Sequence, residues 1–116
     1  MYNLFDCVGV NVSNVNRAFD NVLSWMDDIN MASEADDMVD ELQSVYAKDN
    51  PFDCTQGNRD YDPTNKMIRL LYEHATATIK RKFPDAIIVC VVDGYNSSFK
   101  IDDDTYEKGR AERMAE

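Results

Sequence analysis

The densest group of side chains able to do chemistry is a run of carboxylates in the first half of the chain. No Lys or Arg lies between Arg17 and Lys48, where the acids crowd together. On one helix, side chains three or four residues apart are neighbours at about 5–6 Å, and such a row mimics the regularly spaced phosphates of a nucleic-acid strand. We therefore predict a negative binding surface for a basic partner, made of Asp27, Asp28, Glu34, Asp36, Asp37, Asp40 and Glu41.

The charge of the chain is distributed unevenly. Residues 1–60 hold twelve acids and three bases, a net of −9, and residues 61–116 hold ten acids and nine bases, a net of −1. The competing interpretation of the acidic run is a solvated helix face that only keeps the protein soluble. Aromatic side chains near the run would add apolar anchors to a binding surface: Trp25, Tyr46, Phe52 and Tyr61.

A second candidate site lies in the second half of the chain. Pro84-Asp85 precedes an apolar stretch that ends at Asp93, Lys100 follows on the returning segment, and Glu73 lies on the preceding predicted helix. This order resembles, in part, the PD-(D/E)xK core of restriction-endonuclease-like proteins, in which carboxylates hold a hard cation near a lysine. Ser98 stands where that pattern has an acid, so one ligand is missing. The resemblance implies a degenerate metal-dependent nuclease, which we keep as a third alternative.

The remaining reactive side chains predict no further site. His74 falls on the apolar face of a predicted helix, where a packed histidine is the common case. Cys7, Cys54 and Cys90 form no C-x-x-C pair, so we expect free thiols, with Cys90 acting as a small hydrophobic residue. Glycine-rich phosphate-binding and nucleophile-elbow motifs are absent from the sequence. We expect no cofactor, no metal ion and no enzymatic activity.

Composition limits the class of protein. The chain has 116 residues, a formal net charge of −10 and 44% hydrophobic residues, which fits one domain with a core. A net negative field argues against direct binding of nucleic acid or of an anionic membrane. The longest apolar run, residues 86–92, is far shorter than the roughly 20 residues of a membrane span. The start lacks the basic flank of a secretory signal, and we expect a cytoplasmic protein.

Periodicity predicts a strand and two helices in the first half. Residues 4–12 alternate in the manner of a short strand. A first helix ends near Asn30, and a second is capped by Ser33 and stops before Pro51. Their buried stripes repeat every three or four residues and comprise Val12, Val15, Phe19, Val22, Met26 and Ile29 in the first, and Ala35, Met38, Val39, Leu42, Val45 and Tyr46 in the second.

A turn-rich segment at residues 49–61 leads to the clearest helix start. Asp62 caps a third helix, Pro63 occupies its first turn, and Pro84 halts it. The cations at its end, Lys80, Arg81 and Lys82, suit the negative end of the helix dipole.

The second half then predicts a hairpin and a short helix. Residues 86–92 are apolar on both faces, which places them centrally in a small sheet that helices cover. Residues 97–101 return as a second strand, and Asp104 caps a loosely packed, frayed helix over residues 104–116. The predicted fold is a single α+β domain of residues 1–116, with the order β-α-α-α-β-β-α and about three strands.

Together these patterns favour a non-enzymatic inhibitor. Its acidic face would occupy the basic groove of a nuclease or another nucleic-acid-handling enzyme, as phage anti-defence and toxin-immunity proteins do. The alternative is a structural module that self-associates, as a homodimer, through the seam of the first helix or the edge of the hairpin.

Overall fold

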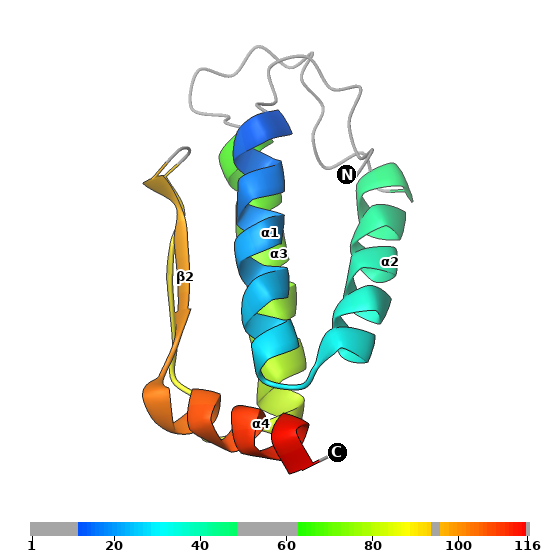
Figure 1. Cartoon of the computed structure of the whole chain (residues 1–116). Coiled ribbons are helices and arrows are strands. Elements are labelled where there is room, and N and C mark those ends of the chain that lie inside the picture. The colour runs from blue at the N-terminus through cyan, green and yellow to red at the C-terminus, as the bar shows by residue number, and fades with distance from the viewer. Residues whose placement is uncertain (1–11, 49–62, 94–95, 116) are drawn as a thin grey trace.

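Four helices and one hairpin make up the described part of the chain. The structure is a computed structural model, and it describes residues 12–48, 63–93 and 96–115. The elements follow in the order α1 (Val12–Asp28), α2 (Ala32–Lys48), α3 (Pro63–Lys82), β1 (Ile88–Val91), β2 (Ser98–Ile101) and α4 (Asp103–Ala115) (Figure 1). This arrangement confirms the predicted helical and α+β character.

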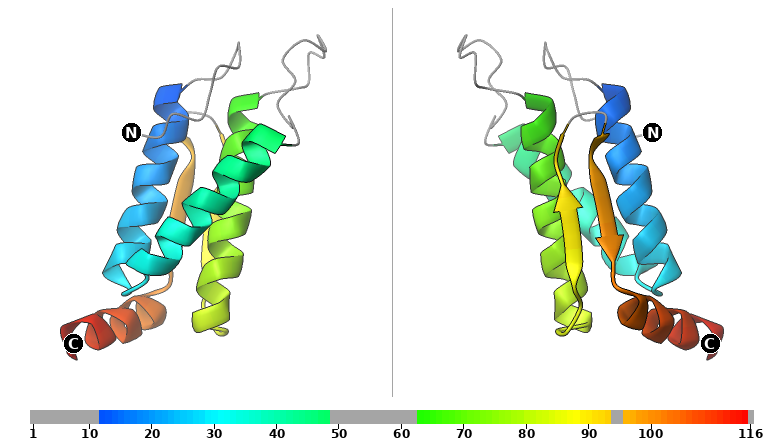
Figure 2. Two further views of the ribbon diagram at one scale, coloured as in Figure 1. Left: turned by 90° about the vertical axis from the view of Figure 1, so that its right-hand side faces the viewer. Right: turned by 90° about the vertical axis from the view of Figure 1, so that its left-hand side faces the viewer.

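The elements are stacked in three layers. Helices α1 and α3 run side by side in the middle, the hairpin of β1 and β2 covers one side of this pair, and α2 crosses its other side obliquely (Figures 1 and 2). Helix α4 lies across one end of the stack, close to the turn between α1 and α2 (Figure 1). The long helices therefore hold α2 and the hairpin on opposite surfaces of the molecule.

The core forms where the apolar stripes of the helices meet. The predicted seam of α1 is fully buried wherever the structure describes its side chains, and the predicted stripe of α2 is buried as far as residue 42. Helix α3 contributes a wide buried face, in which Ile68, Tyr72 and Ile79 lie beside Met67, Leu71 and Ala75. Phe99 of β2 is 1% exposed and packs against Tyr72, with ring centroids 5.4 Å apart.

The connection between α1 and α2 is a tight helix stop. Asn30 has a positive φ of 62°, its N–H donates to the Asp27 carbonyl at 3.1 Å, and the Met31 N–H donates to the Met26 carbonyl at 2.8 Å. This pair of bonds is a Schellman motif, and buried Met26 and Met31 supply its customary apolar contact. The predicted end near Asn30 is confirmed. The predicted cap Ser33 is wrong, because α2 already begins at Ala32.

The hairpin is a two-stranded antiparallel sheet in which Val89 lies opposite Lys100 and Cys90 opposite Phe99. The prediction that residues 86–92 are covered on both faces is wrong. Helices cover one face, and the other leaves Ile87 65%, Val89 57% and Val91 47% exposed. An apolar run without alternation carries no information on which face is buried, so the pattern alone did not reveal the open side.

The third predicted strand, at residues 4–12, has no counterpart in the described chain. Val12 is the first residue of α1, and residues 4–11 lie outside the described residues. The predicted turn-rich segment at residues 49–61 also lies outside them. The sheet that the structure describes therefore has two strands, not three.

Asp102 joins the hairpin to α4. Its carboxylate accepts hydrogen bonds from the Ile87 N–H at 2.9 Å and the Thr105 N–H at 3.2 Å. Asp102 is therefore the N-cap of α4, and the predicted cap Asp104 is wrong, because the helix begins one residue earlier, at Asp103. The helix continues to Ala115, and its buried Gly109 contacts the end of α1.

Candidate functional site

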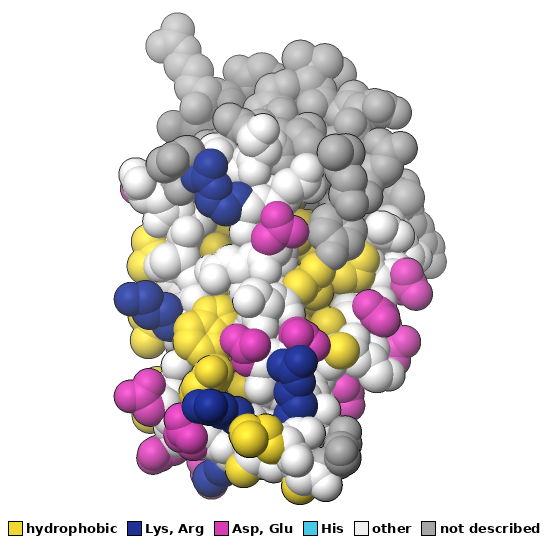
Figure 3. Space-filling model, viewed as in Figure 1, with side chains coloured by type: hydrophobic (Ala, Val, Ile, Leu, Met, Phe, Trp, Pro, Cys, Tyr) yellow, Lys and Arg dark blue, Asp and Glu magenta, His cyan; other side chains and the backbone are white. Residues whose placement is uncertain are grey.

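The outer face of α2 carries most of the predicted acidic surface. Met38 and Leu42 face the core, and the carboxylates occupy the opposite arc of the helix. All five acids of this helix are exposed: Glu34, Asp36, Asp37, Asp40 and Glu41. In the space-filling view, acidic side chains gather on the side of the molecule where α2 lies (Figure 3). We call these five residues the α2 acidic face.

The α2 acidic face is not neutralised by the described chain. None of its five carboxylates lies within 4.0 Å of a described Lys or Arg. His74 of α3 has its Nδ1 3.9 Å from Glu41 Oε1, and this pair attracts only when the imidazole is protonated. The negative field of the α2 acidic face is therefore open to a ligand or partner.

Asp27 and Asp28 are separated from this face. They lie at the end of α1, where Arg113 of α4 approaches Asp27 Oδ2 at 3.5 Å and Asp28 Oδ1 at 3.9 Å. The Arg113 guanidinium also donates to the Asp27 carbonyl at 3.3 Å. The structure thus brings five of the seven predicted acids together and gives the other two an internal partner.

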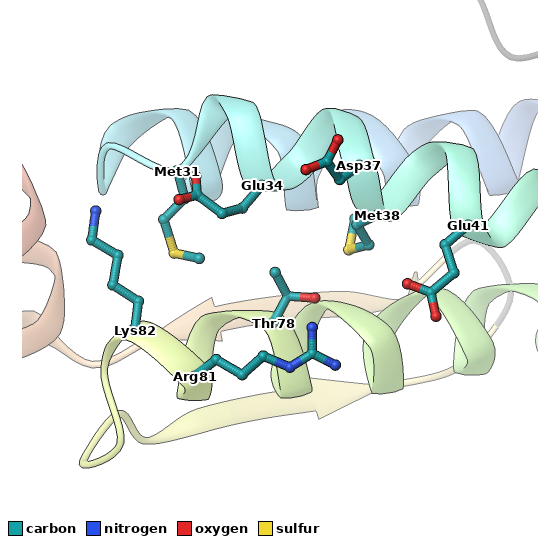
Figure 4. A pocket seen from close by; sticks show the side chains of 8 residues that line it. All are labelled: Met31, Glu34, Asp37, Met38, Glu41, Thr78, Arg81 and Lys82. Carbon is teal, nitrogen blue, oxygen red and sulfur yellow. The ribbon is translucent and has the colours of Figure 1, made fainter.

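A groove runs along α2 where it passes over the second half of α3. It encloses a cavity of about 290 Å³. Met31, directly before α2, and Met38 of α2 project toward α3, while Arg81 and Lys82 of α3 border the opposite wall (Figure 4). The complete lining is Met31, Glu34, Asp37, Met38, Glu41, Thr78, Arg81 and Lys82. The groove therefore brings charges of both signs together over two buried methionines.

The two cations of the groove differ in what they already bind. Lys82 Nζ lies 2.7 Å from Glu112 Oε1 of α4 and donates to the Asn30 carbonyl at 3.1 Å. The hydrogen bond from Lys82, with a second from Asn30, lowers the pKa of Glu112. Arg81 has no ion pair with any residue of the described chain. The groove thus keeps three carboxylates and one guanidinium available.

Sequence reasoning took Lys80, Arg81 and Lys82 only as favourable charges at a helix end. The groove was missed because it depends on the angle at which α2 crosses α3, and no local pattern encodes that angle. The methionines that line it gave no signal either, because Met38 belongs to the predicted buried stripe and both Met31 and Met38 are buried.

The predicted aromatic anchors are dispersed. Trp25 is half-buried on α1 and meets Tyr106 of α4 edge-on, with ring centroids 5.8 Å apart, so it lies away from α2. Tyr46 belongs to α2, but its side chain lies outside the described ones, as do Phe52 and Tyr61. The described chain therefore places no predicted aromatic beside the α2 acidic face.

The residues of the nuclease-like pattern do not converge. Asp85 precedes β1 and Asp93 follows it, so the length of the strand separates them. Lys100 is exposed on β2, opposite Val89. Within residues 12–48, 63–93 and 96–115, no three His, Cys, Asp or Glu side chains gather in a manner that could hold a metal ion.

Cys90 differs from its expected environment. It is exposed rather than buried, with Sγ 3.9 Å from the Thr76 hydroxyl of α3. Partial burial raises the pKa of this thiol, and the Thr76 contact opposes that effect. Cys7 and Cys54 lie outside the described residues.

Comparison with known proteins adds no relative. No family model, no curated protein and no solved structure matches the chain. Among the described helices, none has the length and apolar character needed to span a bilayer.

Proposed function

We propose that the protein is a non-enzymatic binding protein whose α2 acidic face docks on a basic surface of another protein. The observation that carries this proposal is the set of five exposed carboxylates that no described Lys or Arg neutralises. A partner that normally binds nucleic acid would offer the matching array of Lys and Arg side chains. By occupying that array, the protein would act as a competitive inhibitor of nucleic-acid binding.

The groove beside α2 adds a place for a long basic side chain. Glu34 and Glu41 offer carboxylates to the charged end of an inserted Arg or Lys, whose aliphatic part would lie over the buried Met31 and Met38. Arg81, on the other wall, would repel a cation placed too close to α3. An inserted side chain would therefore lie against α2.

The arrangement of charges also carries a stability cost that binding would explain. Asp36 and Asp40, and likewise Asp37 and Glu41, are like charges at i and i+4. Each such pair destabilises a helix by about 0.2–0.5 kcal/mol. A helix face that serves only solubility gains nothing from crowding its acids so closely, whereas a face that meets a basic surface recovers this cost in the complex.

The test compares two proteins of equal charge. In the first, Asp36→Asn, Asp37→Asn, Asp40→Asn and Glu41→Gln neutralise four of the five acids of the α2 acidic face. In the second, Glu73→Gln, Asp85→Asn, Asp93→Asn and Glu107→Gln remove exposed acids elsewhere, so both proteins change from −10 to −6. Partners captured by the wild-type protein at low salt are identified, purified and titrated with all three proteins.

We expect the α2 variant to bind the purified partner at least tenfold more weakly, about 1.4 kcal/mol, with a smaller dependence on salt. The control variant should bind as the wild type does, apart from a modest loss of association rate. The wild-type protein should also displace an oligonucleotide from the partner. Equal affinity and equal salt dependence for wild type and α2 variant would exclude the α2 acidic face as the interface.

A further inference from the structure

Within the part of the chain that the structure describes, the hairpin presents an open strand edge on the side of the molecule opposite α2. Strand β1 pairs with β2 along one edge, and no other described strand pairs with it. The Asp102 N–H donates to the Ile87 carbonyl at 3.0 Å. Because bonded and non-bonded positions alternate along an antiparallel pair, Val89 and Val91 also bond toward β2, whereas the backbone groups of Ile88 and Cys90 point to the open edge.

The same strand exposes a row of large aliphatic side chains. Ile87 is 65%, Val89 57% and Val91 47% exposed, and they lie on one face because side chains alternate along a strand. Natural edge strands are usually protected by an inward charge, a proline or a bulge. Strand β1 contains none of these devices, since its sequence is Ile-Val-Cys-Val in an unbroken ladder.

We propose that β1 pairs antiparallel with β1 of a second copy of this chain, so that two hairpins form one four-stranded sheet. The charge distribution favours contact between two copies at β1 over contact through any other surface of the chain. The chain carries −10, so two copies repel one another through most faces, but residues 86–92 hold no charged side chain. A two-fold axis through β1 therefore joins the copies where like charges are fewest.

The backbone geometry selects a register for the pair. With the Ile88 and Cys90 groups facing outward, Ile88 can exchange hydrogen bonds with Cys90 of the second copy, which sets Val89 opposite Val89 of that copy. Ile87 then lies opposite Val91 of the second copy, and the exposed apolar rows become continuous across the interface. The flanking Asp85 and Asp93 of opposite copies approach at the two ends, so added salt should strengthen the dimer.

Sedimentation equilibrium tests the pairing on the full chain. Across about 10 µM to 1 mM, the range in which small interfaces associate, the mass should rise from 13.3 kDa toward twice that value, and further at higher salt. Val89→Glu should weaken the association at least tenfold, because two carboxylates then face each other across the axis. The exposed Val89 is opposite Lys100, so this variant keeps a favourable cross-strand pair in the monomer and should still fold.

Met114→Glu is the matched control. Met114 is 75% exposed on α4 and the substitution adds the same charge, so the control should associate as the wild type does. Hydrogen exchange locates the contact: protection of the Ile88 and Cys90 amides should rise with protein concentration, while that of Val89 and Val91 stays constant. A monomer throughout the range, equal association of the two variants, or constant exchange at Ile88 and Cys90 would each overturn the proposal. None of these outcomes bears on the α2 acidic face, which lies on the other side of the molecule (Figure 1).

Discussion

Gly109 of α4 lies against the backbone of Ile29 at the end of α1. A Cβ at residue 109 would stand 2.5 Å from the Ile29 Cα and 2.8 Å from its carbonyl oxygen. These atoms belong to a backbone held in place by the helix stop at Asn30, so no rotamer change relieves the contact. The absence of a side chain at Gly109 is what permits α4 to cross this end of the molecule.

Gly109→Ala should therefore destabilise the protein. Helix propensity alone would make alanine favourable by about 1 kcal/mol, but forcing α4 away from α1 costs about 1–3 kcal/mol and disturbs the Arg113 contacts with Asp27 and Asp28. Chemical denaturation of the variant should show a net loss of stability. Ala111→Gly, at an exposed position of the same helix, should show only the propensity loss of about 1 kcal/mol. A stabilised Gly109→Ala protein would mean that α4 does not pack in this way.

The Asp102 carboxylate should make the free energy of unfolding depend on pH in the acidic range. Its hydrogen bonds with Thr105 and then with the Ile87 N–H lower its pKa below the ordinary value of 3.8. A lowered folded-state pKa stabilises the protein above the unfolded-state value, and this contribution is lost as pH falls through the folded-state value. Asp102→Ala should cost about 0.5–2 kcal/mol at neutral pH, the range for a lost N-cap. Denaturation curves recorded at neutral pH and at successively lower pH should show the stability difference between wild type and variant shrinking as pH falls below 3.8, and a constant difference would contradict this role.

The helices were predictable where an apolar stripe agreed with the residues that start and end a helix. Val15, Phe19 and Val22 are all buried as their spacing required, and Pro63 begins α3 as its fixed φ favours. The acids of α2 were likewise assigned to one surface by spacing alone. What spacing could not supply was tertiary placement: Arg113, far along the chain, reaches Asp27, and Arg81 borders the groove because α2 crosses α3 there.

The α2 acidic face should be dispensable for folding. The quadruple variant Asp36→Asn, Asp37→Asn, Asp40→Asn and Glu41→Gln removes like-charge neighbours without touching the buried stripe of α2. We expect its free energy of unfolding to rise by a few tenths to about 1 kcal/mol at low salt, and this gain to shrink as salt screens the wild-type repulsion. Thermal unfolding at two ionic strengths measures it. A clear loss of stability would show that these carboxylates hold the fold together, and the case for a binding surface would weaken accordingly.

Tyr72 offers a test of how tightly α3 and the hairpin are packed. The residue is 2% exposed, its hydroxyl has no hydrogen-bond partner among the described residues, and burial, with a smaller effect from Cys90, raises its pKa to about 12. Because the folded-state value lies above the ordinary 10.0, stability should be intact below pH 10 and fall as pH rises toward 12.

Tyr72→Phe keeps the ring against Phe99 and removes an unpaired polar group, so it should leave stability unchanged or raise it by up to about 1 kcal/mol at neutral pH. In the wild type, phenolate absorbance should show a titration step near pH 12 from Tyr72, and this step should vanish both in the variant and in denaturant. A wild-type titration without that step would mean that water reaches the Tyr72 hydroxyl and that the hairpin does not close over α3.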